Sequence, residues 1–202
     1  MKKTPTGALA GQKKELFCMS ESRKLVVVFP GRGYTCATGL LADGILRWKE
    51  LGYEVLPLDF SAIPFARIDT FAEAFDRVEA AALAQLAGVD LVHCDDLVFF
   101  SKSMGTVAAA RCAADLGLHP RMLPLTPLPE TLDLTRPGDQ VLGMAVGTND
   151  RYIDWHRVRN FCRERGIPCL VCEGVGHALA NRNDPARTEA IRQQVLALCH
   201  PL

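Results

Sequence analysis

The sequence predicts an α/β protein with a mostly parallel central sheet and helices on both faces. Short apolar runs alternate with longer amphipathic segments along the chain from residue 25 to residue 199. Strands of a parallel sheet need crossover connections, usually helices, so this alternation is typical of such a sheet. The first apolar run, residues 25–29, contains no polar side chain, which indicates a strand buried on both faces. In sheets of this kind, ligands bind at the carboxyl ends of the strands.

Six apolar runs have the length and residue types of strands. They are residues 25–29, 54–58, 96–100, 122–125, 141–146 and 168–172. Pro57 lies within the second run and indicates an edge strand or a bulge, since proline has no amide hydrogen to donate. Asp95 and Asp96 stand at the start of the third run, where we expect a solvated turn.

Amphipathic segments between these runs predict helices. Their expected buried positions are, in chain order, Leu41, Ile45 and Trp48; Phe71, Phe75, Val78, Ala82 and Leu86; an alanine-rich face that ends near Asp115; Trp155, Val158 and Phe161; and Thr188, Ile191, Val195 and Leu198. Thr70 and Glu73 have the spacing of a capping box at the start of the second helix. Asp154 and Asp184 are expected N-caps of the last two helices, and Gly166 ends the first of these two.

Length and composition fit one globular domain. The chain has 202 residues, of which 49% are hydrophobic and 23% charged, so it can bury a sizeable core. Its 23 basic and 23 acidic side chains cancel, which removes any global attraction to nucleic acid or to an anionic membrane. No apolar run approaches the roughly 20 residues of a membrane span. We expect a monomer or homodimer that binds neither nucleic acid nor membrane.

The N-terminal segment and the cysteines bear on where the protein works. Residues 1–20 lack the apolar stretch of a secretion signal, so we expect a mobile leader followed by one domain over residues 21–202. The eight cysteines stand singly, mostly in apolar segments, where free cysteine acts as a small core residue. Cys169 and Cys172 have the spacing of a metal-binding pair, but the chain offers no second pair. We expect no metal, no cofactor and a reducing, cytoplasmic setting.

A sharp strand-to-helix turn is predicted where the third strand meets the alanine-rich helix. The sequence there is Ser101-Lys102-Ser103-Met104-Gly105. Such a turn exposes its central side chain, Ser103, and needs small residues two positions away on either side. The amide of Met104, at the helix N-terminus, then faces any oxyanion that forms on a bound carbonyl. The same segment also suits an ordinary helix start capped by Ser101 or Ser103, so by itself it leaves both interpretations open.

Two later strand ends carry an acid and a base. Asp150 follows the strand at residues 141–146, and His177 lies in a glycine-rich loop after the strand at residues 168–172. Serine is a poor nucleophile until a base removes its proton, and imidazole is the side chain that titrates near neutrality. A carboxylate must hold the imidazole and stabilise its protonated form. Asp154 is the alternative acid, although we expect it to cap a helix.

With these motifs the sequence resembles the α/β-hydrolase superfamily over residues 25–199. The resemblance rests on Pro30-Gly31-Arg32-Gly33 after the first strand, on residues 101–105, on Gly147-Thr148-Asn149-Asp150 and on Gly176-His177. It implies Ser103 as nucleophile, His177 as base and Asp150 as orienting acid. It also implies that the amides of Arg32 and Met104 form the oxyanion hole. In two departures, Ser101 replaces the usual first glycine of the elbow and Pro30 replaces the usual histidine of the oxyanion loop; neither abolishes the mechanism.

The segment between the fourth and fifth strands, where the family often inserts a lid, is a short proline-rich loop. We therefore expect a shallow, open site that suits small esters or thioesters better than long lipid chains. Tyr34, Leu128 and Leu132 are the expected pocket walls. Arg32 and Lys102 either favour an anionic substrate or extend into solvent, as long cationic side chains commonly do.

Other functions remain as alternatives. A dinucleotide-binding fold is suggested by Gly31-x-Gly33 after the first strand and Asp59 after the second, although Cys36 stands where that fingerprint has its third glycine. A catalytically silent binding protein with the α/β-hydrolase fold is a second alternative. An acyltransferase or peptidase that uses the same residues is a third, because water and other nucleophiles compete for one acyl-enzyme.

Overall fold

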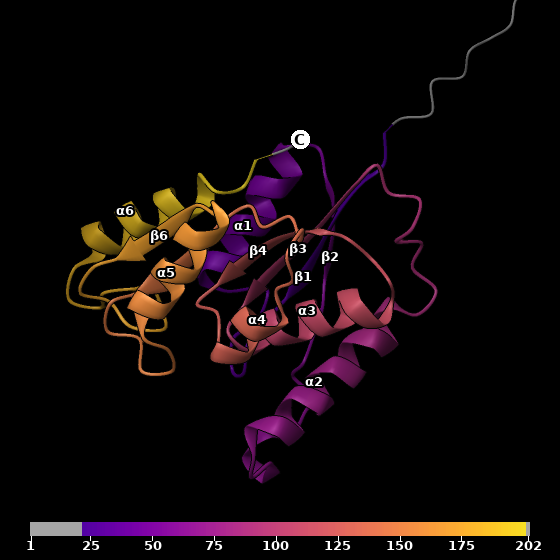
Figure 1. The fold of residues 1–202 in the computed structure, drawn as a ribbon, viewed down its shortest axis with the longest axis horizontal. Helices are drawn as coiled ribbons and strands as arrows, with labels where there is room; N and C mark the ends of the chain where they lie inside the picture. Colours follow the sequence, from indigo (N-terminus) through magenta and orange to yellow (C-terminus); the bar gives the residue numbers. More distant parts are fainter. Residues whose placement is uncertain (1–21, 201–202) are drawn as a thin grey trace, which may run out of the picture.

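The computed structural model describes residues 22–200 and contains a six-stranded sheet whose paired strands are all parallel (Figure 1). The strands are β1 Lys24–Phe29, β2 Glu54–Pro57, β3 Asp96–Lys102, β4 Arg121–Leu125, β5 Met144–Gly147 and β6 Cys169–Cys172. Their order across the sheet is β2-β1-β3-β4-β5-β6. The prediction of a mostly parallel sheet is confirmed, and Pro57 ends an edge strand as its chemistry requires. The leader predicted at residues 1–20 lies outside the described residues.

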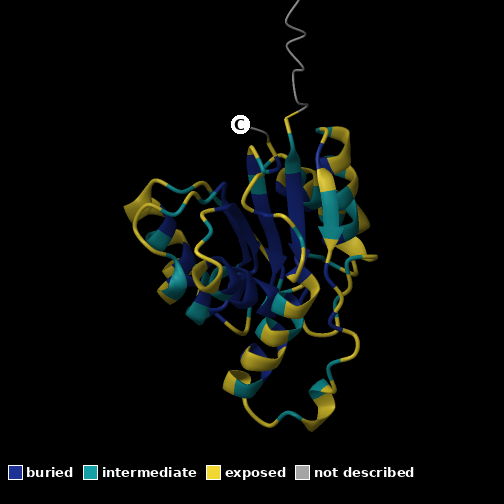
Figure 2. Ribbon diagram, turned by 90° about the vertical axis from the view of Figure 1, so that its right-hand side faces the viewer, coloured by how far each residue is buried: buried dark blue, intermediate teal, exposed yellow. Residues whose placement is uncertain are grey.

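Helices cover both faces of the sheet. They are α1 Gly39–Glu50, α2 Phe71–Leu86, α3 Met104–Asp115, α4 Pro129–Leu134, α5 Trp155–Arg165 and α6 Pro185–Leu196, with a 3₁₀ turn η1 at Phe65–Arg67. Val26 and Val28 belong to the core that includes α1 and α6, whereas Leu25, Val27 and Phe29 belong to the core with α2 and α3. Successive side chains of β1 therefore enter opposite cores, which explains its unbroken apolar run. Figure 2 shows the buried strands between helices whose outer sides are exposed.

Capping signals in the sequence mark the helix ends correctly. Side-chain oxygens of Thr70, Asp154 and Asp184 accept hydrogen bonds from backbone amides in the first turns of α2, α5 and α6, at 3.2, 2.9 and 2.9 Å. Gly166 ends α5 in the left-handed conformation with φ of 66°. These caps satisfy amides and carbonyls that have no partner within a helix.

Phe71 differs from its predicted place on the buried face of α2, since the residue is 54% exposed. It is the first residue of α2, at the end that projects beyond the sheet in Figure 1. Its ring contacts the rings of Phe75 and Tyr152 instead of the sheet, with centroids 6.1 and 6.4 Å away. The helical period placed Phe71 on the correct stripe, but the sheet does not extend far enough to cover it.

The segment between β4 and β5 also differs from its prediction as a loop, because it contains the short helix α4. Pro129 occupies the first position of α4, where a helix needs no amide hydrogen. The hydroxyl of Thr131 accepts a hydrogen bond from the amide of Leu128 at 3.2 Å. The predicted strand at residues 141–146 is shorter than expected, since Val141 only forms an isolated bridge with Met122.

Asp96, predicted in a solvated turn, is instead buried at the amino end of the sheet. Its carboxylate accepts hydrogen bonds from Nε of Arg121 at 2.9 Å and from the hydroxyl of Tyr53. Burial, together with the neighbouring carboxylate, raises the pKa of Tyr53 to about 12. A buried charge needs such partners, and Arg121 comes from the neighbouring strand β4, which the local sequence around Asp96 does not reveal.

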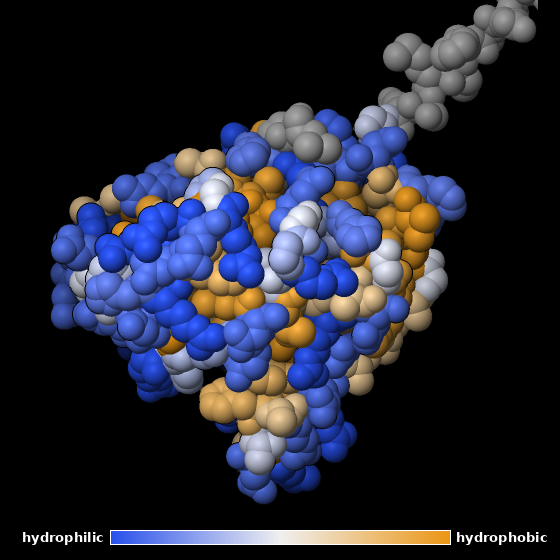
Figure 3. Space-filling view, in the orientation of Figure 1, coloured by the Kyte–Doolittle hydropathy of each residue, from blue (hydrophilic) through white to orange (hydrophobic). Residues whose placement is uncertain are grey.

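The surface of residues 22–200 is mostly polar in the view of Figure 3, and a few large apolar side chains remain exposed on it. Figure 3 shows a mostly hydrophilic face with apolar areas near its centre. The large apolar side chains that stay exposed are Leu46, Phe71, Val92, Leu116 and Tyr152. Among the described helices, none is long and apolar enough to cross a membrane. Cys169 and Cys172 enter different cores, and no described cluster of three or more His, Cys, Asp and Glu side chains has a metal-binding arrangement.

Candidate active site

Three strands deliver polar side chains to one edge of the sheet. Ser103 directly follows β3, Asp150 follows β5 and His177 follows β6. Because all the strands are parallel, their carboxyl ends meet at the same edge. Gly147, at the end of β5, lets the last two loops approach: a Cβ there would collide with the backbone oxygens of Val175 and Gly176.

The turn at Ser103 has the strained geometry of a sharp strand-to-helix elbow. Ser103 has φ of 54° and ψ of −125°, a region that residues other than glycine rarely adopt. Gly105, the second residue of α3, lies so close to the end of β1 that a Cβ would collide with the carbonyl oxygens of Phe29 and Pro30. Ser101 fills the position of the usual first glycine and is fully buried. Small residues at 101 and 105 therefore let this turn hold Ser103 at the edge of the sheet.

Ser103, His177 and Asp150 form a continuous hydrogen-bonded chain. Nε2 of His177 lies 2.6 Å from Oγ of Ser103, and Nδ1 of His177 lies 2.7 Å from Oδ2 of Asp150. The Asp150 side chain is fully buried, and its Oδ1 accepts a hydrogen bond from the amide of Tyr152 at 2.9 Å. The His177 side chain is 19% exposed, and the ring of Tyr152 packs edge-on against it with centroids 4.6 Å apart. Tyr152 thus holds both the acid and the imidazole.

Asp154, the alternative acid, serves a different purpose. Its Oδ1 accepts a hydrogen bond from the amide of His156 at 2.9 Å and lies 2.9 Å from Nδ1 of the same histidine. Its side chain is exposed at the start of α5. The capping role predicted for Asp154 is confirmed, and Asp150 is the carboxylate beside His177.

The predicted oxyanion donors, the amides of Arg32 and Met104, belong to two backbone segments that meet at Ser103. Met104 is the first residue of α3, so its amide has no acceptor within the helix. Gly31 lies against the elbow, where a Cβ would stand 3.0 Å from Cβ of Ser103. Arg32 follows Gly31, and its amide takes no part in the backbone hydrogen bonds found among residues 22–200. No hydrogen bond from the amide of Arg32 or Met104 is found among residues 22–200, so the prediction that these two amides bind an oxyanion remains open.

Lys102 is buried, with 2% of its surface exposed, so the expectation that it extends into solvent is wrong. Its Nζ donates hydrogen bonds to Oγ1 of Thr126 at 3.0 Å and to the carbonyl oxygen of His177 at 2.8 Å. Nζ also lies 5.1 Å from the centre of the Tyr34 ring, within range of a cation–π contact. Burial lowers the pKa of Lys102 to about 8, while the charge of Asp150 opposes part of that shift. Lys102 links the elbow, the end of β4 and the histidine loop.

A cavity of about 500 Å³ opens beside Ser103 and His177. Its other lining residues are Arg32, Tyr34, Lys102, Asn149, Arg151, Tyr152, Gly176, Ala178, Ala180 and Arg182. Tyr34 lines the cavity as predicted, with its hydroxyl accepting a hydrogen bond from the amide of Leu40 at 2.9 Å. Leu128 and Leu132 do not line it: they are 4% and 3% exposed and pack in two separate cores. Both leucines belong to the α4 segment, whose helical turn directs them inward.

The sequence interpretation missed Arg151, Tyr152 and Arg182 as cavity residues. Arg151 and Tyr152 directly follow Asp150, and Arg182 lies five positions after His177. Their closeness in sequence to Asp150 and His177 is the only hint that they line the cavity. The loop conformations decide which of the neighbouring side chains face it.

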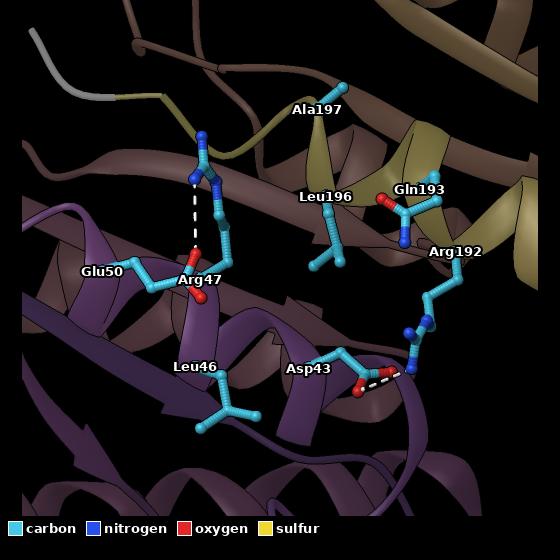
Figure 4. Close-up of a pocket in the computed structure, with 8 residues that line it drawn as sticks. All are labelled: Asp43, Leu46, Arg47, Glu50, Arg192, Gln193, Leu196 and Ala197. Carbon is cyan, nitrogen blue, oxygen red and sulfur yellow. Dashed lines mark hydrogen bonds and ion pairs between the residues drawn. The ribbon is translucent and has the colours of Figure 1, made fainter.

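A second cavity, of about 430 Å³, lies between α1 and α6, away from Ser103 (Figure 4). Its charged side chains pair with one another: Arg47 with Glu50 at 3.4 Å, and Arg192 with Asp43 at 3.1 Å. None of its lining residues is a serine, cysteine or histidine. The cavity beside Ser103 is therefore the better candidate for chemistry.

Comparisons with known proteins identify the fold. No family model and no curated protein matches the sequence. An α/β serine hydrolase homologue from Coxiella burnetii aligns with a TM-score of 0.62 and 17% identity, over 88% of this chain and 85% of that one. A lidless α/β serine hydrolase from Xanthomonas campestris gives 0.62 and 16%, over 88% and 80%. The Pyrococcus furiosus esterase Pf2001 gives 0.60 and 16%, over 88% and 82%. The chain has a small, lidless α/β-hydrolase fold with an esterase among its structural neighbours, and the predicted fold class is confirmed.

Proposed function

We propose that the protein is a serine hydrolase that cleaves small esters or thioesters through an acyl-enzyme on Ser103. The observation that carries this proposal is the hydrogen-bonded chain from Asp150 through His177 to Oγ of Ser103, at 2.7 and 2.6 Å. This constellation performs nucleophilic catalysis on unrelated folds, so the geometry supports the function independently of fold.

In the proposed mechanism, Oγ of Ser103 attacks the substrate carbonyl carbon while Nε2 of His177 takes the hydroxyl proton. Asp150 orients the imidazole and stabilises the cation that forms. The amides of Arg32 and Met104 stabilise the tetrahedral oxyanion. His177 then returns the proton to the leaving alcohol or thiol as the carbon–oxygen or carbon–sulfur bond breaks. Water, deprotonated by His177, attacks the acyl-enzyme and releases a carboxylic acid and free Ser103.

The size and openness of the cavity favour small substrates. It holds about 500 Å³ beside the serine, and the α4 segment between β4 and β5 is too short to form a lid. An open cavity of this size takes a compact acyl group and leaves a long acyl chain in water. The esterase among the structural neighbours supports the same reaction class.

The experiment that tests this proposal is intact-mass analysis after exposure to a fluorophosphonate probe. An activated serine attacks phosphorus and expels fluoride, so wild-type protein is expected to gain one adduct. Ser103→Ala should gain none. Ser61→Ala, which removes an exposed serine hydrogen-bonded to Asp59, should label like wild type. Absence of an adduct on folded wild-type protein would contradict the proposal and favour a binding protein with this fold.

A further inference from the structure

The charges that line the cavity beside Ser103 are all of one sign. Four of its twelve lining residues are cationic, namely Arg32, Lys102, Arg151 and Arg182, and none carries a carboxylate. The whole chain, in contrast, has 23 basic and 23 acidic side chains. Asp150 is close by, but it is fully buried and bound to His177 and to the amide of Tyr152. A ligand in this cavity therefore meets positive charge on several sides.

The cavity cations lack carboxylate partners within residues 22–200. One guanidinium nitrogen of Arg32 donates to the carbonyl oxygen of Phe65 at 3.3 Å, and one of Arg151 donates to the hydroxyl of Tyr152 at 2.7 Å. Both acceptors are neutral. Arginines elsewhere bind carboxylates directly, such as Arg111 with Asp76 and Glu79. Each guanidinium has five N–H donors, so Arg32 and Arg151 keep most of theirs for a ligand.

Contacts with neighbouring residues restrict three of the four cationic side chains that line the cavity. Arg151 is bonded to Tyr152, whose ring packs against His177. The guanidinium of Arg32 lies 5.7 Å from the centre of the Phe65 ring. Lys102 is fixed by its bonds to Thr126 and His177. A carboxylate or phosphate in this cavity gains charge-assisted hydrogen bonds from side chains that are already partly ordered, which reduces the entropy lost on binding.

We propose that the substrate of this site is an ester or thioester that carries a second, anionic group, bound by Arg32, Arg151 and Arg182. The inference rests on the proposed function, because it assigns the cavity to the substrate of Ser103. The shared chemistry is an oxyanion, carboxylate or phosphate, on the same small molecule as the scissile bond. Lys102 adds to the positive potential, and its hydrogen bond to the carbonyl oxygen of His177 positions the histidine loop.

A comparison of matched substrates tests the proposal. Monomethyl glutarate and methyl valerate have acyl chains of the same length, with and without a carboxylate, and methyl 4-phosphonobutanoate replaces the carboxylate with a phosphonate. We expect kcat/KM to be about tenfold or more higher for at least one anionic ester than for methyl valerate, the effect of one charge-assisted pair. Whichever anionic ester is preferred identifies the oxyanion. The preference should shrink as salt screens the charges, and equal kcat/KM for charged and neutral esters would overturn the proposal.

Arginine variants localise the effect. Arg151→Gln and Arg182→Gln should each lower the ratio of kcat/KM for the anionic ester to that for methyl valerate by several-fold. Arg163→Gln removes an exposed arginine of α5 outside the cavity and should leave this ratio unchanged. An equal fall of the ratio in all three variants would contradict specific binding in the cavity and indicate long-range attraction only.

Binding to Ser103→Ala separates this inference from the proposed function. Calorimetric titration of that variant with monomethyl glutarate, methyl 4-phosphonobutanoate and methyl valerate needs no turnover. Tighter binding of an anionic ester, lost in the double variant with Arg151→Gln, supports the anion site even where wild type shows no fluorophosphonate adduct. Labelling of Ser103 together with equal binding of all three esters overturns the anion site alone and leaves the hydrolase proposal standing.

Discussion

Asp150 and Asp154 lie four positions apart, and their hydrogen bonds separate their roles. Asp150 is buried against Nδ1 of His177, whereas Asp154 caps α5. We predict that Asp150→Asn lowers kcat/KM for an ester by about 10³–10⁴-fold, because the amide no longer stabilises the imidazolium or its tautomer. Steady-state ester hydrolysis measures this loss.

Asp154→Asn is the matched control for this prediction, since asparagine is also a good N-cap. It should keep wild-type kcat/KM and nearly wild-type stability. A large loss of activity in Asp154→Asn, with Asp150→Asn active, would reverse the assignment of the acid.

Lys102 gives the molecule a pH dependence of stability with a definite sign. Its pKa in the folded protein, about 8, lies below the ordinary value of 10.5. Between these two pH values the unfolded chain binds the proton more tightly, so unfolding takes up a proton and stability rises with pH. Below pH 8 the buried ammonium is charged in both states, and its full desolvation penalty applies.

We predict that the free energy of unfolding of wild type, relative to Lys102→Met, increases as the pH rises from 8 toward 10. Urea unfolding of both proteins at several pH values measures the difference, in which tyrosines and cysteines common to both cancel. A difference that stays flat over this interval would show that Lys102 is not desolvated as its contacts indicate.

At the scale of elements, Phe71 and Phe75 lie on the same side of α2, but only Phe75 packs in the core. Phe75 is 4% exposed in the core with α3, whereas Phe71 is 54% exposed at the first position of the same helix. We predict that Phe75→Ala lowers the free energy of unfolding by about 3–5 kcal/mol, the cost of losing a buried aromatic side chain.

Phe71→Ala should cost less than about 1 kcal/mol, since about half of the residue is already exposed to water. Urea unfolding of the two variants provides the comparison. Equal losses would mean that Phe71 is covered in solution, against the exposure described above.

The elements themselves follow from local signals. Three helices begin next to their N-caps, Thr70, Asp154 and Asp184, and α5 ends at Gly166. Each of these helix boundaries can therefore be predicted from a few consecutive residues. Where a boundary depends on pairing with a distant strand, the local signal fails. Residues 141–146 contain no polar side chain, so the sequence predicts a strand over the whole run. Only Met144–Gly147 pair with β6.

At the scale of the whole molecule, charged side chains are arranged differently at the two ends of the sheet. At the amino end, Asp96 and Arg121 neutralise each other in the interior. At the carboxyl end, four cationic side chains line the cavity and have no carboxylate partner among residues 22–200. The net charge of zero does not reveal the local charge at either end of the sheet, because electrostatic potential extends only about one Debye length. The cationic cavity is thus a property of the loop arrangement.

The sequence by itself determined the parallel α/β architecture, the order of its elements and the positions of Ser103, Asp150 and His177 just past strand ends. Periodicity, caps and small residues at tight turns act over a few residues, so they can be read without the fold. The catalytic roles of the three residues stay predictions until the serine is labelled.

Only the tertiary structure decided the directions of side chains whose partners are distant in sequence. Lys102 is buried because Thr126 and the carbonyl of His177 converge on it, and Leu128 and Leu132 face inward because α4 packs against the sheet layers. The elements that pack together determine which side chains are buried. The local sequence does not, because a long cationic or apolar side chain can turn either toward the core or toward solvent. The sequence therefore placed Ser103, Asp150 and His177 at the carboxyl end of the sheet, and the packing of the loops decided which other side chains line the cavity beside Ser103 and His177.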